Sequence, residues 1–381
     1  MSARTIASLH PDTHPEAHAE ARPKAQPEPN DPYASSIERY HGSVRTPVGL
    51  AGPLQVFGDH AHGAYPVPLA TTERALVASY HRGCLALDAA GGCRSIVVAE
   101  AMTRTPCFRF EGARESHAFI EWAKNQTPIL KGLVEKTSNH CKLQSVDGQV
   151  EGNHAFLELA FATGEAAGQN MVTIATEAIC SHVMQSFYHE PESVYIEANL
   201  SGDKKATANA MTSVRGKRVV AEVRIDAQVS LEYFGCTPEA FEDHWYASAM
   251  GGALSGSVGL HGHYANALAA LYIALGQDAA CVAESAVGIT RMSARHDQLY
   301  ASVTLPNVIV GTVGGGTQLP DQASYIESMK LPEHQPAHAL AEIIGAVCLA
   351  GELSIASSIA NGTFARAHRI LGRRRSRHVN R

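Results

Sequence analysis

A strand followed by a helix is the clearest local pattern in the chain: Ala155-Phe-Leu-Glu-Leu-Ala-Phe161 and then Gly168 to Phe187. The first is a short apolar run, which is typical of a strand. In the second, apolar residues recur at helical spacing and share one face; they are Met171, Ile174, Ala175, Ile179 and Val183. Further strands are expected at Phe108 to Phe110 and Gln149 to Glu151. The alternation between about Cys107 and Ile196 predicts a small α+β unit inserted in a larger one.

The flanking sequence predicts the elements of that larger unit. Thr71 and Thr72 are good N-cap residues for a helical run from Glu73 to Ala90. Other helices are expected at His263 to Leu275, after Gln277, and at Ala337 to Ile359. Strands are expected at Ser95 to Ala99, Val219 to Ile225, Leu299 to Leu305 and Val308 to Val310, and loops at Thr46 to Pro53, Glu197 to Ala206 and Gly311 to Thr317.

The composition excludes several classes of protein. The chain has 381 residues, 45% of them hydrophobic, and a formal net charge of −6, so no nucleic-acid partner is expected. No window approaches a membrane-spanning run of apolar residues and no apolar signal core stands at the N-terminus, so we expect neither a membrane partner nor secretion. The 8 cysteines form no CxxC pair, which favours reduced, buried thiols in a cytoplasmic enzyme.

Both ends of the chain differ from the rest in composition. Residues 1–30 are rich in Pro, His, Ala and Glu. We expect them to form a disordered tail, because they cannot bury enough apolar surface to become ordered. Residues 373–381 are expected to form a basic flexible tail. Three histidines of the first tail are spaced as on one helix face, but Pro11 and Pro15 oppose that helix, so no metal site is expected.

Four short segments contain residues with catalytic potential, although each has an ordinary structural explanation when taken alone. They are Pro68-Leu-Ala-Thr-Thr-Glu73-Arg-Ala-Leu-Val-Ala-Ser79, Ser201-Gly-Asp203-Lys204-Lys205, Leu275-Gly-Gln-Asp278-Ala-Ala280 and Gly362-Thr-Phe-Ala-Arg-Ala-His368. By position alone, Glu73 would be a first-turn acid that the helix dipole keeps ionised, and Asp278 would be an N-cap. The charges around Lys204 would be solvated, and His368 would be a cation that caps a helix end.

In order and spacing these segments resemble the catalytic domain of 3-hydroxy-3-methylglutaryl-coenzyme A (HMG-CoA) reductases, over roughly residues 35–372. The resemblance implies that Lys204 stabilises the oxyanion that forms as hydride reaches the thioester. It implies that Asp278 bridges Lys204 and Glu73, and that Glu73 is the catalytic acid. His368 would protonate the departing CoA thiolate, a task that suits an imidazole near neutral pH.

The same resemblance assigns residues to substrate binding. Arg104, in Met-Thr-Arg104, would bind the substrate carboxylate, for which a guanidinium is well suited. Asp203 and Lys205 would bind the substrate's hydroxyl and free carboxylate. The remaining residues implied near the substrate are Asn199, His263 and Asn266.

Two segments resemble the family's nucleotide-binding loops and imply NADPH as the cofactor. Ala162-Thr-Gly-Glu165-Ala-Ala-Gly168-Gln-Asn170-Met171 opens a helix, whose first N–H groups suit a phosphate or ribose. As a bare glycine cluster, Gly311-Thr-Val-Gly-Gly-Gly-Thr317 would equally be a hinge. The residues implied are Glu165, Gly168, Asn170, Met171, Gly311, Thr312, Gly314, Gly315, Gly316 and Thr317. Basic residues that would hold the 2′-phosphate are Arg366, Arg369 and Arg373.

The resemblance also implies an α+β fold and a division into domains. A large substrate-binding domain with a central helix, residues 31–105 and 207–372, would be interrupted by a small ferredoxin-like NADPH-binding domain, residues 106–196. Residues 197–206 would form a catalytic loop. The active site would lie between the subunits of a homodimer or tetramer. Such an enzyme would bind HMG-CoA, release CoA and supply mevalonate to isoprenoid biosynthesis through two hydride transfers from NADPH.

Some positions depart from the family pattern. Arg74 stands where relatives have Gly, Glu197 stands where they have a substrate-contacting Ser, and a family Lys has no clear counterpart near Trp245 to Ser248. Three alternatives stay open. They are NAD-linked mevalonate oxidation by the same fold, a non-catalytic regulator that binds CoA or a nucleotide, and a metal-dependent hydrolase built on His261 and His263.

Overall fold

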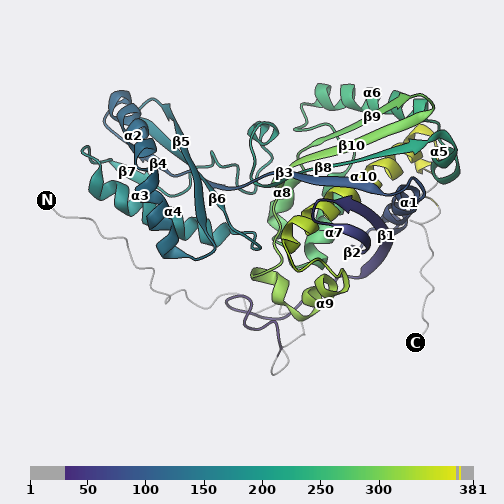
Figure 1. Cartoon of the computed structure of the whole chain (residues 1–381), viewed down its shortest axis with the longest axis horizontal. Coiled ribbons are helices and arrows are strands. Elements are labelled where there is room, and N and C mark those ends of the chain that lie inside the picture. The colour runs from purple at the N-terminus through teal and green to yellow at the C-terminus, as the bar shows by residue number, and fades with distance from the viewer. Residues whose placement is uncertain (1–30, 366–368, 370–381) are drawn as a thin grey trace, which may run out of the picture. The chain divides into compact units, whose positions relative to one another are not determined.

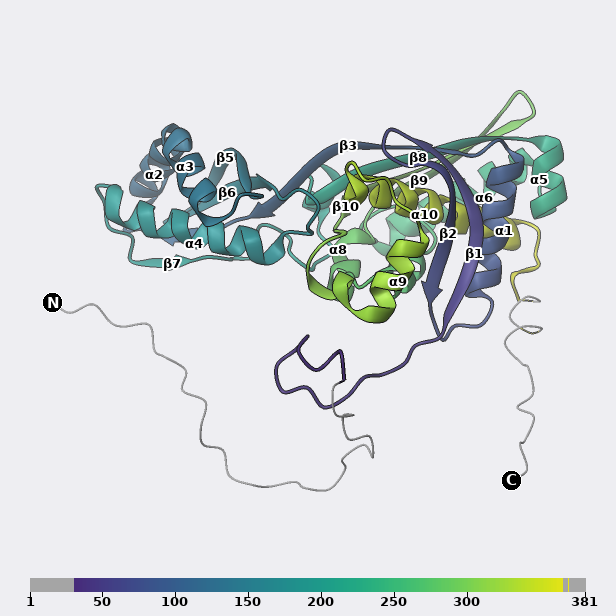
Figure 2. The same ribbon diagram turned by 60° about the horizontal axis from the view of Figure 1, so that its bottom comes forward.

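The computed structural model describes residues 31–365 and 369 (Figures 1 and 2). The predictions made for residues 1–30, for His368 and for the tail at 373–381 therefore lie outside the described residues. Two compact units divide the chain between Arg45 and Thr46, and the second unit contains every strand.

The strands form one ten-stranded sheet of mixed direction. Its main path runs β7-β4-β6-β3-β8-β10-β9, while β1 pairs with β2 and β3, and β5 pairs with β6. The strands are β1 (Val48–Gly58), β2 (His62–Ala70), β3 (Cys93–Arg104), β4 (Cys107–Arg109), β5 (Lys142–Glu151), β6 (His154–Ala162), β7 (Ser193–Tyr195), β8 (Gly216–Asp226), β9 (Ile289–Arg295) and β10 (Gln298–Val308).

Helices and short 3₁₀ turns connect and cover these strands. The helices are α1 (Leu76–Ala89), α2 (Ala113–Asn125), α3 (Thr127–Thr137), α4 (Gln169–Ser186), α5 (Ala227–Phe234), α6 (Pro238–Ser255), α7 (Tyr264–Ala274), α8 (Val282–Ser285), α9 (Pro320–Ser328) and α10 (Pro336–Ala360). The 3₁₀ turns are η1 (Ala208–Met211), η2 (Ala279–Cys281) and η3 (Gly315–Gln318).

Strand β3 belongs to both parts of the sheet. Residues 94–101 pair with β8, whereas Met102–Arg104 pair with β6. The segment that follows contributes β4 to β7 together with α2, α3 and α4, which Figure 1 shows grouped around β5 and β6. Strands and helices thus both occur between β3 and β8, and Arg104 ends the strand that leads into this segment.

Helix α10 is the central helix, and it confirms the prediction made for Ala337 to Ile359. It packs against β1, β3, β8 and β10 on one side and against α1, α6 and α7 on others. By length and composition, it is the one helix within the described residues that could cross a membrane, with a mean hydropathy of 1.8. However, 78% of that apolar window is buried inside the protein, which fits a core helix.

Two buried acids of α10 organise neighbouring loops. Glu352 accepts hydrogen bonds from the backbone N–H groups of Gly262 and His263, both at 2.7 Å, and from the Thr290 hydroxyl. Glu342 accepts from the N–H groups that follow β1. These hydrogen bonds offset part of the cost of burying the two carboxyl groups. Glu352 thereby fixes the chain where it enters α7, which carries the side chain of Asn266.

Several local predictions were wrong, and the reasons are physical. Thr46 to Pro53 was expected to be a loop, but most of it lies in β1, which tolerates Gly52 and Pro53 where its register with β2 shifts. Helix α1 begins at Leu76 rather than Glu73, because Ala75 adopts a left-handed conformation with φ 77°. Glu73 therefore precedes the helix, and its N–H donates to the Thr71 hydroxyl. Between Gln277 and β9, where a further helix was expected, only η2 and the short α8 form.

Candidate active site

Lys204 and Asp278 form the ion pair at the centre of the site. Lys204 lies in the loop between β7 and η1, and its Nζ is 2.9 Å from Oδ2 of Asp278. The two side chains are 45% and 42% exposed, so a substrate can reach them. The hydrogen bond that Lys204 donates to Asp278 raises the pKa of Lys204 above its ordinary value. Lys204 is therefore a cation throughout the neutral range.

Asp278 caps a 3₁₀ turn and also pairs with Lys204. Its Oδ1 accepts the Ala280 N–H at 3.0 Å and so caps η2, while Oδ2 binds Lys204. Partial burial acts to raise the pKa of Asp278, but the hydrogen bonds from Lys204 and Ala280 outweigh it and lower the pKa. The cap therefore fixes the carboxylate that holds the lysine.

Acidic side chains surround Arg104 beside this pair. Arg104 Nη1 is 2.9 Å from Glu197 Oε2 and 3.1 Å from Asp203 Oδ2, and its side chain is almost fully buried. Glu197 also accepts from the Asn199 N–H at 2.7 Å. Lys205 donates to the backbone oxygen of Asp203 at 2.9 Å. The structure thus brings together Arg104, Asn199, Asp203, Lys204, Lys205 and Asp278.

Sequence reasoning missed two charged residues of this cluster, Arg215 and Glu284. Arg215 Nη1 donates to both oxygens of Glu284 at 2.7 and 2.6 Å, and both side chains are buried. Neither belongs to one of the quoted motifs, and Arg215 lies close to two other cations, Lys217 and Arg218, so no local signal marks it. Glu284 is a single charge among small and apolar residues, which was a weak signal because a buried charge needs a partner.

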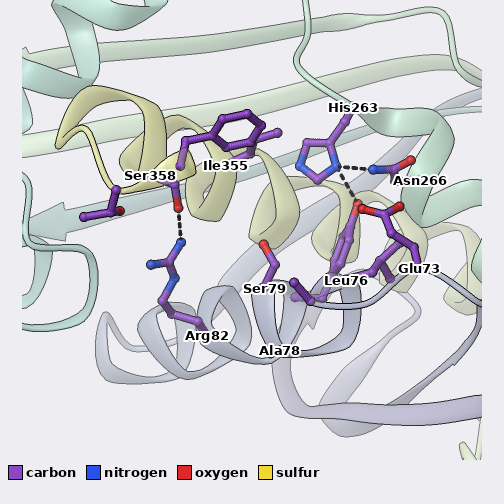
Figure 3. A pocket seen from close by; sticks show the side chains of 13 residues that line it. Glu73, Leu76, Ala78, Ser79, Arg82, His263, Asn266, Ile355 and Ser358 are labelled. Atoms are coloured by element: carbon purple, nitrogen blue, oxygen red, sulfur yellow. Dashed lines mark hydrogen bonds between the residues drawn. The ribbon is translucent and has the colours of Figure 1, made fainter. Parts of the chain in front are cut away.

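Glu73 lines a pocket of about 240 Å³ together with His263 and Asn266. Figure 3 shows these three side chains at one end of the pocket, with Arg82 and Ser358 at the other. Arg82 donates to the Ser358 hydroxyl at 2.8 Å. Within residues 31–365, Glu73 forms no ion pair with Lys204, so the single chain does not assemble all the predicted catalytic groups.

The hydrogen bonds of His263 determine which ring nitrogen carries its proton in the neutral form. Nε2 lies 2.9 Å from the Gly351 carbonyl oxygen, which can only accept, so Nε2 is the donor. Nδ1 therefore accepts, from the Tyr80 hydroxyl at 3.2 Å and the Asn266 amide at 3.3 Å. His263 is oriented by three partners and faces the pocket as a fixed group.

The two segments predicted to bind a nucleotide lie against each other. The Thr312 N–H donates to the Glu165 carbonyl at 2.8 Å, and Ala166 pairs with Val313 in a β-bridge. Gly168 precedes α4 with φ 81°, and no side chain caps that helix, so the first N–H groups, from Gln169 to Met171, are available to an anion. The carboxylate of Glu165 accepts the Ala337 N–H at 2.7 Å, at the start of α10.

The glycine-rich loop also contacts the segment that carries Asp278. Gln277 makes two hydrogen bonds of 2.9 Å with the backbone of Gly311. Gly314 and Gly315 have positive φ angles of 76° and 56°, a backbone conformation that glycine adopts more readily than residues with a side chain. Gly316 and Thr317 lie in η3, and the Thr317 hydroxyl donates to the Gly314 carbonyl at 2.7 Å. The Lys204–Asp278 pair thus lies beside both of the segments that the sequence predicts to bind a nucleotide.

Histidines that suggested a metal site have other partners. The His261 ring stacks on Tyr264 with centroids 4.2 Å apart. Across residues 31–365 and 369, no group of three His, Cys, Asp or Glu side chains is placed to hold a metal ion.

The chain matches the family model described as hydroxymethylglutaryl-coenzyme A reductase over residues 8–373. It belongs to the HMG-CoA reductase family.

Relatives within the HMG-CoA reductase family are similar over most of their length. The 3-hydroxy-3-methylglutaryl-coenzyme A reductase of Aeropyrum pernix is 41% identical over 347 residues, which cover 90% of this chain and 82% of the relative. The protein of that name from Halobacterium salinarum is also 41% identical, covering 89% and 85%. The resemblance inferred from four short segments is therefore confirmed.

A solved structure shows the same fold. The class II HMG-CoA reductase from Streptococcus pneumoniae, bound to NADPH in open conformations, matches with a TM-score of 0.70 and 18% sequence identity. The match covers 86% of this chain and 88% of that one. The mixed helix-and-sheet architecture predicted from the sequence is thus the fold of the HMG-CoA reductase family.

Proposed function

We propose that this member of the HMG-CoA reductase family reduces HMG-CoA to mevalonate and CoA by two hydride transfers from NADPH. The observation that carries the proposal is the Lys204–Asp278 ion pair at 2.9 Å beside the two nucleotide segments. Residues 106–196 would form the nucleotide-binding domain, and residues 31–105 and 207–372 the domain that binds HMG-CoA. Residues 197–206 would form the catalytic loop.

The residues present suit a dinucleotide. The uncapped start of α4 and the Gly311–Thr317 loop supply backbone N–H groups, which are the usual ligands of a pyrophosphate. Arg369 is exposed and, with Arg366 and Arg373, would hold a 2′-phosphate. The bound nucleotide would supply hydride. The protein's task is to hold the thioester and stabilise the charge that hydride produces.

Lys204 would donate a hydrogen bond to the thioester oxygen and stabilise the oxyanion that forms there. His368 would give its proton to the sulfur of the departing CoA, because a neutral thiol leaves more readily than a thiolate. Glu73 would donate the proton in the second reduction. Asp278 would keep Lys204 charged and aimed at the carbonyl.

We further propose that two copies of the chain share each site. Glu73, His263 and Asn266 line one pocket, whereas Lys204 and Asp278 belong to another cluster. Helix α6 supports an interface: Tyr246, Met250 and Leu254, four residues apart, are 55%, 63% and 90% exposed. A stripe of exposed apolar side chains at this spacing is typical of a helix that packs against a partner.

We also place the protein in the cytoplasm. All eight cysteines are free and buried. Reduced thiols on this scale fit a reducing environment.

The activity is tested by following NADPH oxidation with HMG-CoA as substrate. We expect oxidation that depends on HMG-CoA, and a kcat/KM for NADPH at least about tenfold above that for NADH, since an arginine–phosphate contact contributes roughly 1.5–3 kcal/mol. A preference for NADH, with faster oxidation of mevalonate than reduction of HMG-CoA, would instead support a catabolic enzyme. Ligand binding without any turnover would contradict the proposal.

Glu197→Ser tests how the substrate carboxylate binds. Glu197 forms an ion pair with Arg104 in the structure. A substrate carboxylate must therefore compete with Glu197 for the guanidinium group of Arg104. We expect the serine variant to lower the KM for HMG-CoA by about tenfold, with kcat changed less than about threefold, because one charged hydrogen bond is released. Glu192→Ser, which breaks the exposed ion pair with Arg109, is the matched control. A KM that stays the same or rises would contradict this role of Glu197.

A further inference from the structure

The buried pair of Arg215 and Glu284 contacts the loop that contains Lys204. Glu284 is completely buried on α8, and its Oε1 accepts the backbone N–H of Lys204 at 3.0 Å. Burial raises the pKa of Glu284, while Arg215 and the Lys204 N–H act in the opposite direction. Arg215 also lies 3.0 Å from Asp203 Oδ1 and donates to Gln169 Oε1 at 3.4 Å. The pair therefore connects the catalytic loop to the start of α4.

Lys204 has a backbone conformation that needs support. Its φ is 57°, in the left-handed region that side chains other than glycine rarely occupy. Such a conformation costs about 1 kcal/mol or more and persists where surrounding contacts impose it. The hydrogen bond from the Lys204 N–H to Glu284 is a contact at the strained residue itself.

Two acids of one short segment thus hold Lys204 at both ends. Asp278 binds the ammonium group, and Glu284, six residues later, binds the backbone N–H. We propose that Glu284, held by Arg215, is a positioning residue that fixes the backbone of Lys204 so that its ammonium group reaches Asp278 and the substrate carbonyl. The inference rests on the proposed function in taking Lys204 as the catalytic cation.

A pair of substitutions isolates the contact. Glu284→Gln and Glu284→Val both remove the negative charge, but only glutamine keeps an oxygen that can accept from the Lys204 N–H and from Arg215, as Oε1 does now. We expect the valine variant to lower kcat about a hundredfold, since a displacement of about 1 Å has that effect. The glutamine variant should stay within about threefold of the parent kcat.

A second measurement does not depend on activity. Reductive methylation with formaldehyde and cyanoborohydride, followed by peptide mass spectrometry across a pH series, reports the titration of each lysine. The groups facing Lys204 are Asp203, Asp278, Cys281 and Glu284. We expect the Lys204 midpoint to move to lower pH in Glu284→Val and to stay near the parent value in Glu284→Gln. Equal shifts in the two variants would show a charge effect alone and overturn the proposal.

Controls separate positioning from stability. Leaving Arg215 buried without its Glu284 partner could prevent folding. The double variant Arg215→Met/Glu284→Val removes both buried charges, which is often tolerated, and still lacks the acceptor. We expect it to show the same loss of kcat and the same shift at Lys204. A folded double variant with parent kcat and parent Lys204 titration would refute the proposal. Absence of HMG-CoA turnover in the parent would refute the proposed function alone, because the methylation experiment would still report on the contact.

Discussion

Lys204→Ala is expected to lower kcat for HMG-CoA reduction by about a hundredfold to a thousandfold, the usual cost of removing one donor to an oxyanion. The ammonium group of Lys204 is the cation that Asp278 aims toward solvent and substrate at this site. Alanine leaves Asp278 with its cap to Ala280 and without its cation, so the negative charge that develops on the thioester oxygen would also meet an unpaired carboxylate. Steady-state assays with saturating NADPH and HMG-CoA measure the effect.

The control for this substitution is Lys131→Ala. Lys131 is an exposed lysine on α3, and its removal changes the net charge of the chain by the same amount. We expect parent kcat from this control and an unchanged melting temperature in both variants. If Lys204→Ala retained the parent kcat, Lys204 would not be the oxyanion donor, whatever the activity of the chain.

Mixing two inactive variants is expected to restore activity. In the proposed dimer, Glu73 of one subunit meets Lys204 of the other. Glu73→Gln and Lys204→Ala should each be inactive alone. After subunits exchange at random, half of the dimers are mixed, and each mixed dimer has one intact site of two, which gives about a quarter of the parent activity.

The outcome depends on which chain supplies each group. If Glu73 and Lys204 acted within one chain, no mixed dimer would contain an intact site, and the mixture would remain as inactive as its components. Measuring the mixture immediately after combination, before subunits exchange, supplies the baseline. The structure of the single chain favours sharing, because Glu73 lines a pocket with His263 while Lys204 pairs with Asp278.

The parts of the fold that the sequence predicts well are those with long regular patterns. Helix α10 lies within one residue at each end of the prediction, because its apolar run is long and ends near glycine and proline signals. Strand β8 contains the strand predicted at Val219 to Ile225 and continues beyond it at both ends. By contrast, α2 and α3 were not predicted, since they are short and carry many charged residues on their exposed faces.

Local reasoning fails where distant contacts decide the conformation. Thr71 and Thr72 are residue types that often cap a helix. However, Ala75 adopts a left-handed conformation, so the helix begins only at Leu76 and Glu73 lies before it. Arg215 and Glu284 are 69 positions apart in the chain, and only the folded structure shows that they meet. Motif matching found Lys204 and Asp278, but it could not find Arg215 and Glu284, because both lie outside the quoted motifs.

The burial of α10 has a consequence for how the protein is made. All ten strands precede Pro336 in the chain, so the ribosome completes the surfaces that enclose this helix before the helix itself emerges. A nascent chain therefore carries an uncovered apolar sheet until synthesis is nearly finished. When α10 is synthesised, the strands that will cover it are already present. This apolar helix, which could otherwise associate with a membrane, can therefore become buried within its own chain.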